Sequence, residues 1–194
     1  LMSGAAYSGK FTNVDNLGGS FEPRTTATDL ALENSILYGA KVGIYPKSGI
    51  LGLETEVFNA HNDINSQTRT FNEPTFGPFL QTQEGRVRVT TWAINVLARV
   101  PINDKLVAHV AIGPAILFSK LSLANEQSQS ASNIGLNTQL GLNYSVTKQL
   151  SVFGEWKLNH ARIKYPSKGT TEGFDANYNP HALVVGLSYY FDAP

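Results

Sequence analysis

Eight ionisable side chains in this sequence are spaced so that they could act as one group. Each lies in a stretch where polar and apolar residues alternate, and each belongs to the polar set: Lys10, Lys41, Glu54, Glu56, Arg99, His109, Glu155 and Lys157. Alternate residues of a β-strand lie on one face, so strands would present these side chains to a common space. Two kinds of chemistry are then open: a salt-bridged network that fills the space, or a narrow polar path that opens when the network shifts. Buried charges must be paired or solvated, which favours the network.

Catalysis by a histidine base is a further candidate, centred on His160. Acyl transfer needs a hydroxyl nucleophile within reach of the imidazole, and the residue two positions after His160 is Arg162. The other histidines show no paired metal-ligand spacing. Cysteine is absent, so thiolate metal sites and disulfides are excluded. We therefore expect no catalytic residue, no metal and no cofactor.

The elements that would position these side chains are β-strands. Segments with a period of two, rich in Val, Ile, Tyr, Phe and Thr, recur through the 194 residues. Helical periodicity is confined to residues 27–33, too few for a stable helix. No shift in composition divides the chain, so we expect one domain over residues 1–194. The expected strands cover residues 2–12, 34–46, 50–60, 86–101, 105–121, 132–146, 149–165 and 180–191.

The connections between these segments are alternately long and short. The short ones are turns at residues 46–49, 101–105 and 146–149, and the long polar ones cover residues 13–33, 61–85, 122–131 and 166–179. Transmembrane barrels have short periplasmic turns and longer outward loops, because every second hairpin emerges on the same side. The pattern therefore predicts an all-β fold, an eight-stranded antiparallel up-and-down transmembrane β-barrel.

Such a barrel requires the apolar face of each strand to point outward. The opposite faces carry Gly, Ser, Asn, Gln and a few opposite charges, which suits a narrow lumen better than the Lys- and Glu-rich surface of a soluble sheet. Aromatic residues gather toward strand ends on the apolar face, like the interfacial girdles of membrane barrels: Tyr38, Trp92, Phe118, Tyr144, Trp156, Tyr189 and Phe191. The alternative is a soluble barrel or sandwich, in which the apolar face points inward. Formal net charge is zero, so nothing indicates nucleic acid binding.

The last segment, residues 181–191 (HALVVGLSYYF), is similar to a known type of strand. It resembles the terminal strand of outer-membrane β-barrels, which ends in an aromatic residue preceded by alternating apolar residues; here three more residues follow Phe191. Together with residues 38–43, 51–56, 141–144 and 150–155, it makes the chain similar to the opacity-protein and OmpA-type eight-stranded barrels. This resemblance implies a location in the bacterial outer membrane of a Gram-negative organism. No signal peptide is visible at residues 1–4, so we expect a processed or trimmed chain.

The resemblance leaves the activity open, because similar barrels include adhesins, envelope-stabilising proteins, narrow pores and lipid-modifying enzymes. We expect a non-enzymatic protein whose outward loops serve envelope integrity, surface interaction or partner docking. One alternative is a narrow channel for small or hydrophobic solutes, with a lateral opening where Gly113-Pro114 interrupts a strand. The other is a lipid-modifying enzyme: residues 159–162 resemble the His-bearing strand of lipid A deacylase barrels but lack the serine of those enzymes.

The expected partners are outer-membrane lipid and lipopolysaccharide, with no nucleic acid and with the outward loops open to a protein partner. His160, Arg162 and Lys164 could meet lipopolysaccharide phosphates near the outward rim. The longest expected loop contains Phe71, Phe76, Phe79 and Leu80 among polar residues. These apolar side chains would either contact a partner or fold over the mouth of the barrel.

Overall fold

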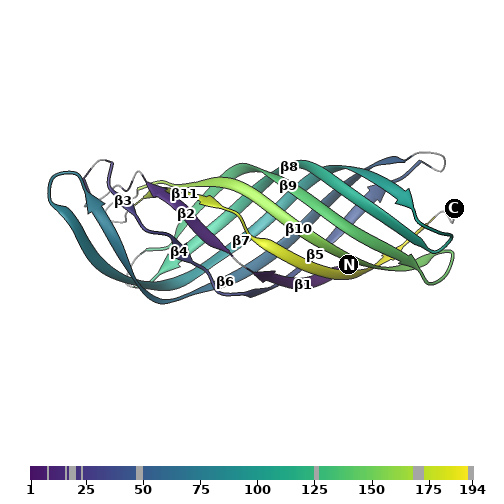
Figure 1. Ribbon diagram of the computed structural model, residues 1–194, viewed down its shortest axis with the longest axis horizontal. Helices are drawn as coiled ribbons and strands as arrows, with labels where there is room; N and C mark the ends of the chain where they lie inside the picture. The colour runs from purple at the N-terminus through teal and green to yellow at the C-terminus, as the bar shows by residue number, and fades with distance from the viewer. Residues whose placement is uncertain are drawn as a thin grey trace.

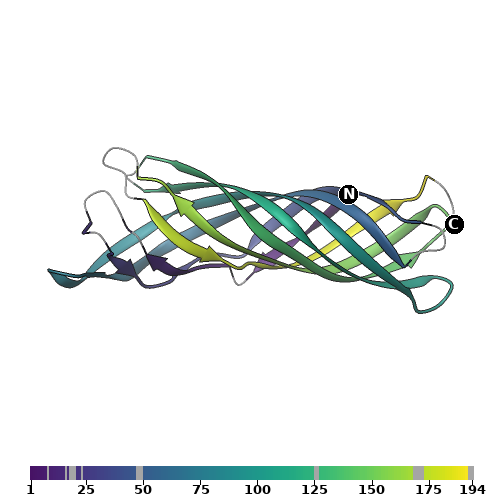
Figure 2. The ribbon, with the colours of Figure 1, turned by 90° about the horizontal axis from the view of Figure 1, so that it is seen from above.

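The alternating segments fold into antiparallel strands that close into a ring of eight, as predicted (Figure 1). The computed structural model describes the whole chain apart from residues 8, 16, 18–20, 23, 47–49, 125–126, 168–172 and 192–194. The barrel is elongated, and its strands are tilted relative to its long axis in both views (Figure 2). Among the described residues, no helix is sufficiently long and apolar to span a membrane.

Three of the eight wall strands are made of shorter pieces. In chain order the strands are β1 (Met2–Tyr7) with β2 (Lys10–Asp15), β3 (Thr26–Ala27) and β4 (Leu30–Ala31) with β5 (Ser35–Ile44), β6 (Leu51–Glu73), β7 (Gly77–Pro101), β8 (Leu106–Leu123), β9 (Gln129–Ser145), β10 (Leu150–Tyr165), and β11 (Phe174–Tyr178) with β12 (His181–Tyr189). β1 closes the ring, because Gly4 faces Leu37 of β5 on one side and Val184 of β12 on the other. A Cβ atom on Gly4 would lie 2.1 Å from the Leu183 carbonyl oxygen, so this close approach requires glycine.

Large apolar side chains cover the outer face of the barrel in the half that contains the short turns. On β6 they are Leu51, Leu53 and Val57, which are all exposed. On β12 the exposed side chains are Leu183, Val185, Leu187 and Tyr189. An apolar belt around the outside of a closed barrel is the surface that a bilayer requires, because the hydrocarbon core solvates no polar side chains. We refer to this part of the barrel as the membrane half.

Beyond the apolar belt the strands continue with the opposite polarity. On β6 the outward side chains become polar, with His61 half-buried and Asp63 exposed, whereas Ile64 and Phe71 are buried inside. The inward side chains of this outward half form one apolar core, whose fully buried members include Phe11, Leu30, Phe71, Val87, Leu117, Ile163 and Tyr178. The outward half is therefore built like a soluble β-barrel, with a mainly apolar interior and a polar exterior.

This change of polarity explains why the sequence-based prediction of three connections is wrong. Residues 61–85 are not a loop, because β6 and β7 continue as a hairpin to a turn at residues 74–76. The expected loop at residues 13–33 contains the end of β2 and all of β3 and β4. The expected loop at residues 166–179 contains β11, which pairs with β10 and β2. In all three places apolar side chains point inward, and so they do not continue the outward apolar rows that defined the predicted strands.

Two of the predicted short turns, at residues 101–105 and 146–149, lie at the end of the barrel where β12 ends (Figure 1). The turns at residues 101–105 and 146–149 are tight: Ile102 N–H donates to the Leu106 carbonyl at 2.8 Å, and Val146 N–H to that of Leu150 at 2.9 Å. The third predicted turn, at residues 46–49, falls almost entirely outside the described residues. Short turns at this end correspond to the periplasmic side of a membrane barrel.

The wall is continuous at Gly113 and Pro114, where a lateral opening was considered. β8 pairs with β9 through both residues, and its register with β7 is unchanged on either side of them. A Cβ atom on Gly113 would lie only 1.9 Å from the Ile94 carbonyl oxygen of β7. The two strands are therefore in close contact at this point, and the proline interrupts the ladder without separating them.

Candidate functional site

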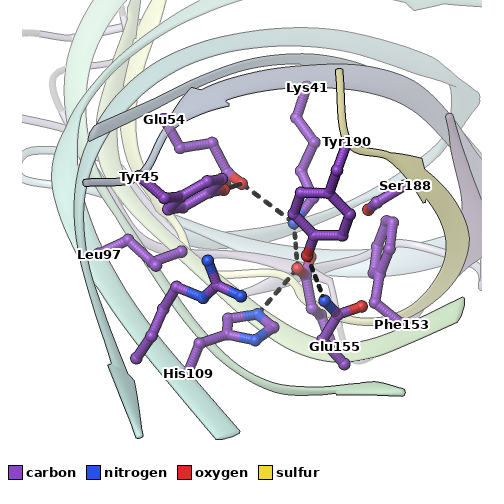
Figure 3. A pocket seen from close by; sticks show the side chains of 11 residues that line it. Lys41, Tyr45, Glu54, Leu97, His109, Phe153, Glu155, Ser188 and Tyr190 are labelled. Atoms are coloured by element: carbon purple, nitrogen blue, oxygen red, sulfur yellow. Dashed lines mark hydrogen bonds and ion pairs between the residues drawn. The ribbon is translucent and has the colours of Figure 1, made fainter. Parts of the chain in front are cut away.

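Six of the predicted charged side chains meet inside the membrane half. Two strands each contribute a pair of inward side chains two residues apart. These are Glu54 and Glu56 on β6, and Glu155 and Lys157 on β10. β5 adds Lys41 and β8 adds His109 (Figure 3). We call these six residues the lumen cluster. The period of two along each strand brings them together, since an inward residue is followed by another inward residue two positions later.

Lys157 lies at the centre of the lumen cluster. Its ammonium is 2.6 Å from a carboxylate oxygen of Glu56 and 3.1 Å from one of Glu155, and it also donates to the side-chain oxygen of Gln139. The Lys157 side chain is 1% exposed, and neither carboxylate is exposed at all. A charge buried this completely is tolerated only with opposite charges in contact, and both partners of Lys157 supply them.

Lys41 and His109 complete the cluster on the periplasmic side of Lys157. The Lys41 ammonium contacts Glu155 and lies 3.3 Å from Glu54, and its charge also faces the ring of Phe153 at 4.3 Å. A ring nitrogen of His109 is 3.0 Å from the same Glu155 oxygen. Glu155 therefore joins three basic groups, Lys41, His109 and Lys157, from three different strands. It holds opposite sides of the barrel together across the lumen.

Amide side chains that the sequence analysis did not single out complete the hydrogen bonding. Asn95 of β7 donates to Glu56 at 3.2 Å, and Asn137 of β9 donates to the same oxygen. Gln139 donates to Glu54 at 2.7 Å while it accepts from Lys157. The sequence signal that could have identified them is their position on the polar face of a strand. Amide side chains on that face point into the lumen, where they hydrogen-bond to other lumen groups.

Arg99 and Lys10, the remaining two of the eight predicted side chains, lie outside the lumen cluster. Arg99 is half-buried near the periplasmic mouth, where its guanidinium faces the ring of Tyr45 at 4.6 Å. Lys10 is exposed on the outer face, which corrects its predicted inward position. The buried residues Ala6 and Phe11 flank it at an odd spacing, so the alternation shifts by one residue between β1 and β2.

The lumen holds little free space beside the cluster. A cavity of about 30 Å³ lies at the periplasmic mouth, where Tyr45, Arg99 and Tyr190 line it together with members of the lumen cluster (Figure 3). This volume has room for roughly two water molecules. Above the cluster, Phe11 packs edge-on against Tyr165 and Phe174 in the apolar core of the outward half. The charged lumen and the apolar core thus fill the barrel in series.

The predicted girdle residues all lie on the outer face. Their exposed fractions range from 37% for Trp156 to 89% for Phe191. Tyr144, Tyr189 and Phe191 are near the short turns, whereas Tyr38, Trp92, Phe118 and Trp156 lie where the apolar belt gives way to polar residues. The indole N–H of Trp92 donates to the Thr55 hydroxyl at 2.9 Å, which satisfies its polar atom on the belt.

His160 is hydrogen-bonded to an amide side chain and, among the described residues, to no nucleophile. Its Nδ1 atom is 2.5 Å from the Asn179 side-chain oxygen, and no serine hydroxyl is hydrogen-bonded to it within the described part of the chain. Arg162 pairs with Asp15 at 2.6 Å, and this hydrogen bond raises the pKa of its guanidinium. The region carries paired surface charges and lacks the Ser–His contact that acyl transfer requires.

Comparisons with known proteins agree with this geometry. The sequence matches a family model described as an outer membrane protein beta-barrel domain over residues 2–191. The fold is similar to that of Neisserial surface protein A, with 9% sequence identity and a TM-score of 0.50, covering 97% of this chain and 96% of that one. It is also similar to the outer membrane protein OprG from Pseudomonas aeruginosa, with 9% identity and a TM-score of 0.54, covering 99% and 95%. No curated protein matches the sequence. At such low identity the two structures show a shared barrel fold and nothing finer.

Proposed function

Because the chain belongs to the family of outer membrane protein β-barrel domains, we propose that it is a closed, non-enzymatic barrel that anchors a rigid outward wall for surface interaction. The membrane half supplies the anchor. The outward half, with its own apolar core, presents the β6–β7 hairpin above the membrane (Figure 1). Envelope integrity and partner docking are roles that such an anchored wall would serve.

The observation that carries this proposal is the filling of the barrel by two layers of opposite character. A conducting path would need water beside the charges and a polar route through the outward half. The ammonium of Lys157 is almost completely buried between its two ion partners, and the next layer is mainly apolar. An ion that leaves the lumen cluster would enter a mainly apolar region, where transfer of a charge is very costly. A narrow channel is therefore the less favoured function.

Contact with lipopolysaccharide fits the outer face just above the apolar belt. Arg88 of β7 lies directly opposite Lys120 of β8 in the strand register, and both are exposed. Like charges in this position repel each other unless an anion lies between them, and neither has a carboxylate partner among the described residues. Phosphate groups of the outer leaflet have the charge and the hydrogen-bond acceptors to bridge these two side chains.

We expect the purified protein to carry no steady current in a planar bilayer. The lumen cluster is fully paired, so no ion can pass without breaking several buried contacts at once. Single-channel recording over a range of voltages checks this expectation, with a known open porin as the positive control. A stepwise current that persists at low voltage would show an open lumen and favour the channel.

A further inference from the structure

β7 has a free edge over its first eight residues, where the ring is no longer complete. Its ladder with β6 runs to the pair Glu73–Gly77, but its ladder with β8 stops at the pair Gly85–Leu123. Within the described part of the chain, residues 77–84 therefore have a neighbouring strand on the β6 side only. The β6–β7 hairpin extends beyond the ends of β8 and β9 (Figure 1).

The strand register identifies which main-chain groups of β7 point toward the free edge and away from β6. Leu80 is opposite Thr70 of β6, and the Thr70 carbonyl accepts a hydrogen bond from Thr28 N–H on its other side. The Thr70–Leu80 pair is therefore not hydrogen-bonded, and the N–H and C=O of Leu80 point away from β6. At the lower end, the Glu84 carbonyl accepts from Ala124 N–H, on the β8 side. Since direction alternates along a strand, residues 78, 80, 82 and 84 all face the free edge.

Most of this edge lacks the features that normally protect an exposed strand, since only Pro78 and Glu84, at its two ends, are of the protective kinds. Natural proteins place charges, especially lysine, on free edges to prevent pairing. Residues 77–83 contain no charged side chain, and Leu80 is 69% exposed. Beside the edge, the rings of Phe21, Phe71 and Phe79 form a cluster in which every pair of ring centroids is 5.2 to 5.9 Å apart. The free groups are regularly spaced main-chain donors and acceptors, so the complementary ligand is another extended polypeptide strand.

We propose that the occupant of this edge is the same edge of a second copy of the protein, paired antiparallel about Gln81. In this register Leu80 of each copy is opposite Thr82 of the other, and both residues direct their N–H and C=O groups toward the partner. The proposal rests on the proposed function of the outward wall and names the partner of that wall.

The two ends of the edge are complementary in this register. Pro78 lies opposite Glu84 of the other copy in this register. Pro78 has no N–H to donate, and the Glu84 carbonyl needs none, because it already accepts a hydrogen bond from Ala124 N–H of its own chain. The Glu84 N–H is left to donate to the Pro78 carbonyl, so no main-chain group in the segment is orphaned. The uncharged residues 77–83 also bring no like charges together across the pair.

Antiparallel pairing of this edge fixes the direction of the two barrels. β7 runs from the outward tip toward the membrane, so its partner must run toward a membrane on the opposite side. The contact therefore joins proteins in two facing membranes, as between neighbouring cells. A single pair of eight-residue edges is a weak contact, but many copies on two surfaces engage together and gain strength by avidity.

Clustering of proteoliposomes tests this inference. Vesicles that display the outward end of the wild-type protein should cluster in proportion to the density of the protein, as measured by turbidity. Thr82→Pro removes one edge-facing N–H without touching the β6–β7 ladder and should reduce clustering at least about tenfold. Thr82→Ala removes the same hydroxyl but keeps the N–H, so this matched control should cluster like the wild type. Thr82→Lys, which places a charge on the edge, should behave like Thr82→Pro.

Folding of each variant is checked by the slower migration of the heat-treated protein in gels, so that loss of clustering is read only from folded protein. Wild-type vesicles that do not cluster, or Thr82→Pro vesicles that cluster undiminished, overturn the inference. The same vesicles are tested for conductance. Absence of clustering with no current overturns the edge contact alone, whereas clustering with a steady current overturns the closed lumen alone.

Discussion

Replacement of Lys157 by methionine should lower the free energy of unfolding of the barrel by about 3–5 kcal/mol, the typical cost of removing one partner from a buried ion pair. The substitution keeps the length of the side chain and removes its charge. Glu56 then loses its ammonium contact at 2.6 Å, and Glu155 loses the one at 3.1 Å. Both carboxylates remain fully buried, with less positive charge to balance them. Unfolding in urea from detergent micelles or vesicles, followed by tryptophan fluorescence, measures the change.

A second substitution separates charge balance from packing in this experiment. Glu56→Gln in the Lys157→Met background removes the orphaned charge and should restore a large part of the lost stability. Arg86→Ala is the surface control: Arg86 pairs with Asp63 at 2.7 Å, but both side chains are more than half exposed, so the expected loss is below about 1 kcal/mol. Equal effects of Lys157→Met and Arg86→Ala would refute the structural role of the lumen cluster.

Replacement of Phe11 by alanine should destabilise the outward half by about 3–5 kcal/mol, the range for removal of a large buried aromatic side chain. Phe11 is fully buried, and its ring contacts those of Tyr165, Phe174 and Tyr178. These contacts tie β2 to β10 and β11 above the apolar belt. The resulting cavity lies in the apolar core of the outward half and not in the lumen cluster, so the membrane half should keep its structure.

Hydrogen exchange read strand by strand measures this second effect. Protection should fall in β2, β11 and the upper part of β10, while the folded band in gels and the protection of the membrane half remain. Phe76→Ala is the matched control, because it removes the same ring at a position that is 81% exposed and should change protection little. Uniform loss of protection through the whole barrel would contradict the independence of the two halves.

The lumen cluster was predictable from the sequence because its members obey strand alternation. Glu54 and Glu56, and Glu155 and Lys157, are separated by two residues within segments whose other face is apolar, so each pair had to share a face. The partner choice was not predictable. That Glu155 would bind Lys41 and His109 depends on the order and register of strands far apart in the chain, which period-two patterning does not encode.

The outward half was missed for a physical reason. In the membrane half the apolar residues point to lipid, and a search for outward apolar rows finds them. At Ile64 the alternation is unchanged, but the apolar residue is now on the inward face. A register shift between Ile64 and Gln67 then changes the alternation, so that Phe71 also points inward. The segment therefore looked like a polar loop with scattered aromatics. Of these, Phe71 proved to be core and Phe76 exposed, which a sequence without register information could not distinguish. Lys10 was misplaced by a similar shift between β1 and β2.

The distribution of the buried charges along the chain also determines when the barrel can enter the membrane. Lys41 bonds to a residue 114 positions later in the chain, and Glu56 to one 101 positions later. Until β10 is in place, Glu56 lacks the Lys157 ammonium that pairs with it, and an unpaired carboxylate at membrane depth is costly. Insertion of the early hairpins one by one is thereby disfavoured. The charges act as a checkpoint in assembly, which admits the barrel to the bilayer only when nearly the whole chain has been paired.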